Sequence, residues 1–167
     1  PTLVMEVRDR SRVPERMLAD LNAQQREWCE QGLAEFDAVD DAVRERYFDA
    51  LFAAVRKLDE SGVTLLAGTD TPNHCIAPAV SLSVELERLT EAGLSPLSVL
   101  QSATLNPAKV FGFTDVGVEV GDAADFVLLA QNPLETVAAY RQPVGVFTQG
   151  RWYDAERLAS LRVSVEQ

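Results

Sequence analysis

Apolar residues recur at helical spacing over much of the first two thirds of the chain. After Pro14, which favours the first position of a helix, the pattern from Glu15 to about Gln31 predicts a helix. Asp40 or Asp41 can cap a second helix that ends near Glu60, where Ser61-Gly62 closes it. Three shorter helices are predicted further on, over Ser81–Ala92, from Ser95-Pro96 to about Ala103, and from Asn106-Pro107 to Gly112.

Two segments in this part of the chain favour strands rather than helices. Val63–Ala67 is almost entirely apolar, and a strand without polar alternation is typical of a parallel sheet that helices cover on both faces. Thr2–Val7 is a shorter apolar run that also suits a buried strand. A helix, a glycine turn and a buried strand form half of a repeating α/β unit, so the sequence predicts α/β architecture here.

The pattern changes after Phe113, where short apolar stretches alternate with turn residues. Gln149-Gly150 suits a tight turn between two of these stretches, because glycine accepts a positive φ. We therefore divide the chain into an α/β part at 1–112, a β-rich part at 113–153, and a helix and tail at 154–167. The predicted elements after Phe113 are strands at Val116–Val120, Phe126–Ala130, Val144–Thr148 and Arg151–Tyr153, and a helix at Asp154–Leu161.

Composition and charge restrict the classes of partner. The chain has 167 residues, of which 47% are hydrophobic and 25% charged, and its formal net charge is −11. These values are globular, and the negative charge disfavours nucleic acid and anionic membranes as partners. No apolar run approaches the roughly 20 residues that cross a bilayer. Cys29 and Cys75 have no metal-ligand spacing and make no disulfide framework, which predicts a reducing, cytoplasmic setting.

Asp70 is the strongest candidate for chemistry. It follows the apolar segment Val63–Ala67, and catalytic groups gather at the carboxyl ends of strands in parallel α/β folds. It can alternatively cap the turn Thr71-Pro72-Asn73. His74, the only histidine, is either an ordinary loop residue or a ligand, and a zinc site needs three or four ligands.

Other catalytic patterns are weaker. The sequence has no GxSxG elbow and no glycine-rich phosphate loop. Cys75 directly follows His74, but a catalytic Cys–His pair needs facing side chains, which neighbours on a loop rarely offer. We expect Glu85 and Glu87 to be solvated helix positions.

An ordered series of motifs over about residues 60–155 resembles the C-terminal part of the amidohydrolase superfamily, in its imidazolonepropionase-like and prolidase-like branch. Each motif alone is weak, and their order makes the resemblance specific. The matching motifs are Gly68-Thr69-Asp70, Leu82-Ser83-Val84-Glu85-Leu86, Glu91-Ala92-Gly93-Leu94-Ser95-Pro96, Ala103-Thr104-Leu105-Asn106-Pro107-Ala108, Gly117, Val120-Gly121-Asp122-Ala123-Ala124-Asp125-Phe126-Val127-Leu128-Leu129, Asn132-Pro133-Leu134, Val146 and Gly150-Arg151-Trp152-Tyr153.

The resemblance implies the C-terminal portion of a metal-dependent (β/α)8 TIM barrel with part of a small β-sandwich. Thr2–Val7 and Val63–Ala67 would be the seventh and eighth barrel strands, and 113–153 the C-terminal share of the sandwich. Asp70 would be the aspartate that contacts a divalent metal, zinc by preference, and takes a proton from the bound water. His74 would contribute to substrate binding. The reaction implied is hydrolysis of C–N bonds in small molecules, such as non-peptide or cyclic amides or dipeptides.

The chain also departs from the family pattern. The paired histidines of the first strand, the lysine of the fourth, and the histidines of the fifth and sixth have no counterpart in the sequence. Ser83 and Asp122 stand where relatives often have a histidine and a lysine.

We therefore expect a C-terminal fragment that is inactive alone and associates with itself or with the missing N-terminal part, because a two-strand slice of a barrel leaves strand edges uncovered. Two alternatives stay open: a non-catalytic amidohydrolase module that only assembles, and a small α/β binding protein.

Overall fold

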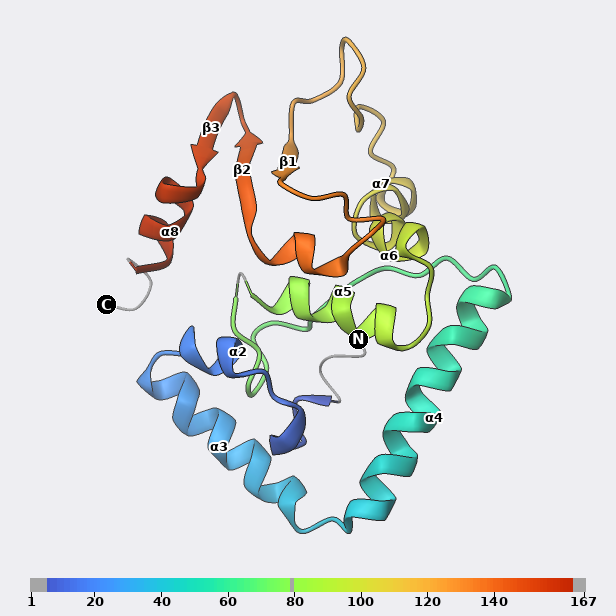
Figure 1. Ribbon diagram of the computed structural model, residues 1–167, viewed down its shortest axis with the longest axis vertical. Coiled ribbons are helices and arrows are strands. Elements are labelled where there is room, and N and C mark those ends of the chain that lie inside the picture. Colours follow the sequence, from blue (N-terminus) through green and yellow to red (C-terminus); the bar gives the residue numbers. More distant parts are fainter. Residues whose placement is uncertain (1–5, 79, 164–167) are drawn as a thin grey trace.

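The computed structural model describes residues 6–78 and 80–163, and Figure 1 shows how their elements are arranged. Within the described residues no helix is long and apolar enough to span a membrane. The helices are η1 (Arg10–Arg12), α2 (Glu15–Ala19), α3 (Ala23–Asp37), α4 (Asp41–Glu60), α5 (Ser81–Glu91), α6 (Pro96–Ala103), α7 (Leu105–Phe111), η2 (Val137–Arg141) and α8 (Ala155–Val163), and the strands are β1 (Phe126–Leu129), β2 (Pro143–Thr148) and β3 (Arg151–Asp154).

The single helix predicted from Glu15 to about Gln31 is in fact two helices, α2 and α3. Asn22 begins α3 with a capping box: the Gln25 backbone N–H donates to Asn22 Oδ1 at 2.9 Å, and the Asn22 N–H donates to Gln25 Oε1 at 3.0 Å. This local pair satisfies helix-terminal N–H groups and fixes a new start. Helix α3 then continues through Gly32 to Asp37, so Gly32 neither ends nor interrupts it.

The other helices follow the sequence pattern more closely. Asp40 caps α4 by accepting hydrogen bonds from the backbone N–H groups of Ala42 and Val43. Ser95 caps α6 by accepting from the N–H of Ser98 at 3.0 Å. Gly93 and Gly112 have positive φ angles just after α5 and α7, where the chain leaves the helix. The predicted helix at the chain end is α8.

The prediction of a strand at Val63–Ala67 is wrong. The segment is irregular and has no ladder, and Val63 and Leu66 are 46% and 40% exposed. A buried parallel strand needs a neighbour on each side, and the described residues provide none. Residues 2–5 of the predicted strand Thr2–Val7 lie outside the described residues; Glu6 is helical and Val7 lies in a turn.

A three-stranded antiparallel sheet, in the order β1-β2-β3, forms the β-rich part. Gln149 and Gly150 both have positive φ angles and make the tight turn between β2 and β3, as predicted. The predicted strand at Val116–Val120 is wrong, because only an isolated bridge joins Val116 to Ala123. That stretch is exposed throughout.

Two hydrophobic clusters meet at α5, which lies centrally in Figure 1. One cluster joins α2, α3 and the segment before α5, with Met17, Leu33 and Ile76 among its buried residues and Val84 from α5. The other joins α5 to α6, with Leu86 buried and Phe52 of α4 packed against it. Helix α5 therefore supplies side chains to both clusters.

Candidate active site at Asp70

Two hydrogen bonds hold the segment that leads to Asp70 against the α6–α7 corner. The backbone N–H of Ala67 donates to the Ser102 carbonyl at 2.9 Å. The side-chain amide of Asn106 donates to the Leu65 carbonyl, also at 2.9 Å. An extended backbone without a neighbouring strand needs such partners for its polar groups. These contacts take over part of the role that a sheet ladder would have.

Asn106 corrects one sequence interpretation. The pair Asn106-Pro107 was expected to cap a helix, but α7 already begins at Leu105, and Thr104 at the cap position makes no side-chain cap hydrogen bond. The Asn106 amide instead positions the segment before Asp70. Sequence reasoning missed this role, although the polar residue inside the motif Ala103–Ala108 was a signal for it.

Asp70 lies at the exposed end of this segment and has a φ angle of 57°. The side-chain amide of Asn73 lies 3.4 Å from Asp70 Oδ2, at the long end of the hydrogen-bond range. The flanking hydroxyls of Thr69 and Thr71 lie 3.0 Å apart. The carboxylate thus stays accessible to a ligand or to water, while a weak turn contact orients it.

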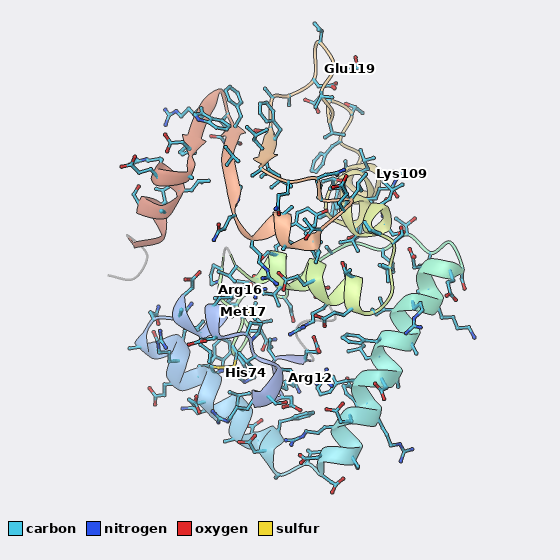
Figure 2. The ribbon with its side chains drawn as sticks, viewed as in Figure 1. Arg12, Arg16, Met17, His74, Lys109 and Glu119 are labelled. Carbon is cyan, nitrogen blue, oxygen red and sulfur yellow. A yellow bond between two sulfur atoms is a disulfide. The ribbon has the colours of Figure 1, made fainter. Side chains whose placement is uncertain are left out.

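His74 is turned towards α3 rather than towards Asp70. Asn73 Oδ1 accepts a hydrogen bond from the His74 backbone N–H at 2.9 Å and lies 2.9 Å from the ring Nδ1. The ring centroid is 5.0 Å from that of Trp28, and a Cβ placed on Gly32 would lie 2.2 Å from His74 Cδ2. A glycine in the middle of α3 therefore makes room for the His74 ring, which Figure 2 shows beside this helix.

Cys29 of α3 and Cys75 form a disulfide with their Cα atoms 4.5 Å apart. The sequence pattern predicted no disulfide framework and, from that, a reducing setting; the bond removes the basis of this inference. That reasoning considered a framework of several bridges, whereas here the fold brings together two residues 46 positions apart. Figure 2 shows the bridge close to His74. In this disulfide, Cys75 is available neither as a nucleophile nor as a metal ligand.

The donor set around Asp70 does not form a metal site by itself. Among the described residues there is no group of three or more histidine, cysteine, aspartate or glutamate side chains that could hold an ion. Asp70 offers one carboxylate, and the His74 ring packs on α3. A metal role for Asp70 and a substrate contact by His74 both stay predictions.

Glu85 and Glu87 of α5 are not solvated, contrary to the sequence interpretation. Glu85 and Glu87 are 2% and 7% exposed. Glu87 pairs with Arg16 of α2 at 2.5 Å and with Arg141 of η2 at 2.8 Å. A buried carboxylate is retained at low cost only when it is paired, so Glu87 joins α2, α5 and η2 structurally.

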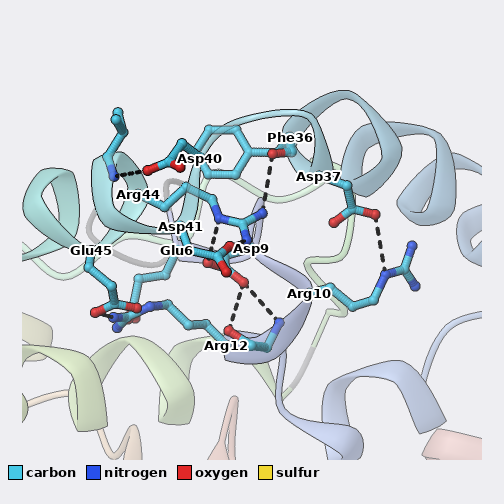
Figure 3. A network of polar contacts seen from close by, with 12 residues as sticks. Glu6, Asp9, Arg10, Arg12, Phe36, Asp37, Asp40, Asp41, Arg44 and Glu45 are labelled. Carbon is cyan, nitrogen blue, oxygen red and sulfur yellow. Dashed lines mark hydrogen bonds and ion pairs between the residues drawn. The ribbon is translucent and has the colours of Figure 1, made fainter.

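A second ionic network, drawn in part in Figure 3, fixes the first described residues. Glu6 is buried and pairs with Arg12 at 3.0 Å and with Arg88 of α5 at 2.6 Å. Burial raises the pKa of Glu6 above its usual value, although these two guanidinium groups act in the opposite direction. Arg44 of α4 pairs with Asp9 at 3.5 Å. The network attaches η1 to α4 and α5. Its residues do not adjoin Asp70 in the sequence.

Comparisons with known proteins show which proteins the chain resembles. Imidazolonepropionase of Symbiobacterium thermophilum is 35% identical over 101 residues, which are 59% of this chain and 23% of that protein. Ochratoxinase of Aspergillus niger is 31% identical over 102 residues, which are 59% of this chain and 20% of that protein. The structure of a bottromycin amidohydrolase matches with a TM-score of 0.80 at 28% identity, over 99% of this chain and 38% of that one.

These matches confirm the predicted resemblance and the α/β fold class. The chain spans about a fifth of the length of the curated relatives it matches. The sequence profile of the Amidohydrolase family covers residues 16–153, which include Asp70, most of the two hydrophobic clusters and all of the three-stranded sheet except Asp154. The chain belongs to the amidohydrolase family.

Proposed function

We propose that this chain supplies the acid–base carboxylate, Asp70, of a hydrolase that cleaves C–N bonds in small molecules. The bond would be a non-peptide or cyclic amide or that of a dipeptide. Membership of the amidohydrolase family and relatives named as an imidazolonepropionase and an ochratoxinase support this class of reaction. The observation that carries the proposal is the exposed Asp70 carboxylate at the end of a segment that Asn106 holds.

In this proposal Asp70 accepts a proton from the attacking water and passes it to the leaving nitrogen. A positioned general base or acid typically contributes about 10²- to 10⁴-fold to the rate. Amidohydrolases typically use divalent metals, and we propose zinc with Asp70 as one ligand. A bound metal would activate the water. The described residues do not supply the remaining ligands.

We also propose that the surroundings of Asp70 contact the substrate, with His74 as the candidate. Its ring nitrogen Nδ1 is occupied by Asn73, so Nε2 is the atom through which it would act.

The test of the proposed function compares Asp70→Asn with Glu60→Gln, each made in the longest natural polypeptide that contains these residues. Both changes remove one acidic charge, and Glu60 lies exposed at the end of α4. Hydrolysis of a panel of cyclic amides and N-acyl amino acids should fall about 100-fold or more for Asp70→Asn and remain unchanged for Glu60→Gln. Equal activity of the two variants would exclude Asp70 as the acid–base group. Hydrolysis by the purified 167-residue chain alone would contradict its predicted inactivity.

A second candidate function is a module that acts only by assembling. Apolar side chains lie exposed on β1 and on the loop before it, and large uncovered apolar surfaces are typical of interfaces. We propose that further polypeptide of the amidohydrolase fold covers them, and a second copy of the chain is the competing occupant. Sedimentation of the purified chain distinguishes the cases: a compact monomer at all concentrations contradicts self-association. The exposed residues are Val116, Val118, Val120, Phe126, Val127 and Leu128.

A further inference from the structure

The loop that follows Asp70 is attached to α3 by two contacts that no comparison assigns to a function. The first is the disulfide between Cys29 and Cys75, five positions after Asp70. The second is the packing of the His74 ring against Trp28 and over Gly32. Both contacts connect the loop to the same stretch of α3. We call residues 68–75 the Asp70 loop.

We propose that the Cys29–Cys75 disulfide is a redox-dependent clamp that positions the Asp70 loop. Upstream of the loop, Ala67 and Leu65 are anchored to the α6–α7 corner. Downstream, Cys75 is anchored to α3. The loop therefore spans two elements that lie in different hydrophobic clusters, and its conformation depends on both anchors.

The contacts inside the loop are too local to replace the downstream anchor. They join residues no more than three positions apart, as between Asp70 and Asn73 or between Thr69 and Thr71. The bridge links the end of the loop covalently to α3, whereas the contacts inside the loop link it to no other element. Opening the bridge would leave the loop to the packing of His74 and of the adjacent apolar residues, and to a 3.5 Å contact between Thr71 Oγ1 and Ser81 Oγ of α5.

The redox step is an ordinary thiol–disulfide exchange with a dithiol reductant. A thiolate of the dithiol attacks one cysteine Sγ, the Sγ–Sγ bond breaks, and the second thiolate of the dithiol then displaces the first cysteine. Cys29 and Cys75 together gain two electrons and two protons, and the dithiol ends as a disulfide. In a reducing compartment this reaction favours the open form, so the position of the loop would report the surroundings of the protein.

Burial of the bridge determines how the clamp opens. Cys29 and Cys75 are 1% and 0% exposed. Exchange requires access to sulfur, so a reductant can react only when the packing around the bridge opens locally, while the bond still joins the Asp70 loop to α3. Reduction should therefore be slow in the native protein and should accelerate in denaturant concentrations that still leave α6 folded.

The test is amide hydrogen exchange of the full chain, oxidised and reduced, together with the double variant Cys29→Ser/Cys75→Ser. The informative amides are those of His74 and Ile76, which donate to the Asn73 side-chain and backbone oxygens. Their exchange should accelerate at least about tenfold in the reduced protein and in the variant. The amide of Val99, which donates to Ser95 within α6, is the control and should change less than twofold.

Four results would overturn the clamp. The first is reaction of both cysteines with an alkylating reagent in the purified, unreduced chain. The second is equal amide exchange at His74 and Ile76 in both redox states. The third is amide exchange that accelerates at Val99 as much as at those two residues. The third result would show that the bridge stabilises the whole chain rather than the loop. An Asp70 loop without protection in any form would also contradict the inference.

The link from the clamp to catalysis rests on the proposed function of Asp70. The hydrogen-exchange measurement on the loop does not depend on that function. In the longest natural polypeptide, reduction should lower kcat for amide hydrolysis, and Cys29→Ser/Cys75→Ser should remove this redox response. If hydrolysis is absent while the exchange difference is present, the proposed function fails and the clamp stands. If hydrolysis is present and the exchange difference absent, the clamp fails alone.

Discussion

The contact between Gly32 and His74 makes a prediction whose sign depends on a second residue. Alanine is favoured over glycine inside a helix by about 1 kcal/mol, and Gly32 lies within α3. A Cβ at this position, however, would lie 2.2 Å from His74 Cδ2, 2.6 Å from Cγ and 2.8 Å from Nε2. The ring cannot move without cost, because Asn73 bonds to it and Cys75, the next residue, is bridged to α3.

Overpacking a buried site typically costs about 1–3 kcal/mol. Gly32→Ala alone should therefore change the free energy of unfolding by between about 0 and −2 kcal/mol, the overpacking cost minus the helix gain. In a His74→Ala background the clash is absent, and the same change should stabilise the chain by about 1 kcal/mol. The coupling energy of the double-mutant cycle is then about 1–3 kcal/mol.

Urea unfolding followed by far-UV circular dichroism measures all four proteins of the cycle. Ala34→Gly provides the scale, because Ala34 is exposed on α3 and this change reports the helix preference alone. If Gly32→Ala stabilises the chain equally with and without His74, the ring does not occupy the space over Gly32. The contact between the Asp70 loop and α3 would then be wrong.

The remaining predictions concern other parts of the fold. Gly145→Ala should destabilise the chain by about 2 kcal/mol in thermal unfolding, because a Cβ there would lie 2.2 Å from Trp152 Cζ2. Asn106→Ala should cost about 1–2 kcal/mol by leaving the Leu65 carbonyl without its donor, and Asn106→Asp should not restore the loss, because a carboxylate cannot donate. The pKa of Glu6 is raised in the folded chain, so its contribution to stability is present below its ordinary pKa of 4.5 and is lost as pH rises through the folded pKa. The free energy of unfolding of Glu6→Gln, measured from pH 4.5 upwards, should lack this loss.

Helix boundaries were predictable where a local signal sets them. Asp40 and Ser95 cap helices through their own side chains, and Gly112 ends one through its backbone. The break before α3 was missed because Asn22 and Gln25 lie inside an amphipathic pattern that runs on without interruption. The strand at Val63–Ala67 was wrong because a strand exists only through its neighbours, which a pattern within one segment cannot supply.

The candidate site was predictable in one residue and not in its support. Asp70 follows from its place after an apolar segment and from the family motif around it. The supports come from residues distant in the sequence: Asn106 bonds to a segment 41 positions earlier, and Cys29 bridges 46 positions. No spacing rule links such pairs, because the fold alone brings them together. Gly32 was visible in the sequence, but its reason, the His74 ring, was not.

The central place of α5 has a consequence for building chimaeras from amidohydrolase sequences. Val84 packs in one hydrophobic cluster and Leu86 in the other, and between them the chain advances by less than one helical turn. A crossover point within α5 would therefore pair each cluster with a foreign complement of side chains. A crossover at the exposed pair Ser61-Gly62 would leave α5 intact but would still separate Met17 and Leu33 from Ile76 and Val84. It would also take Cys29 and Cys75 from different parents, so a chimaera made there needs a cysteine at both positions.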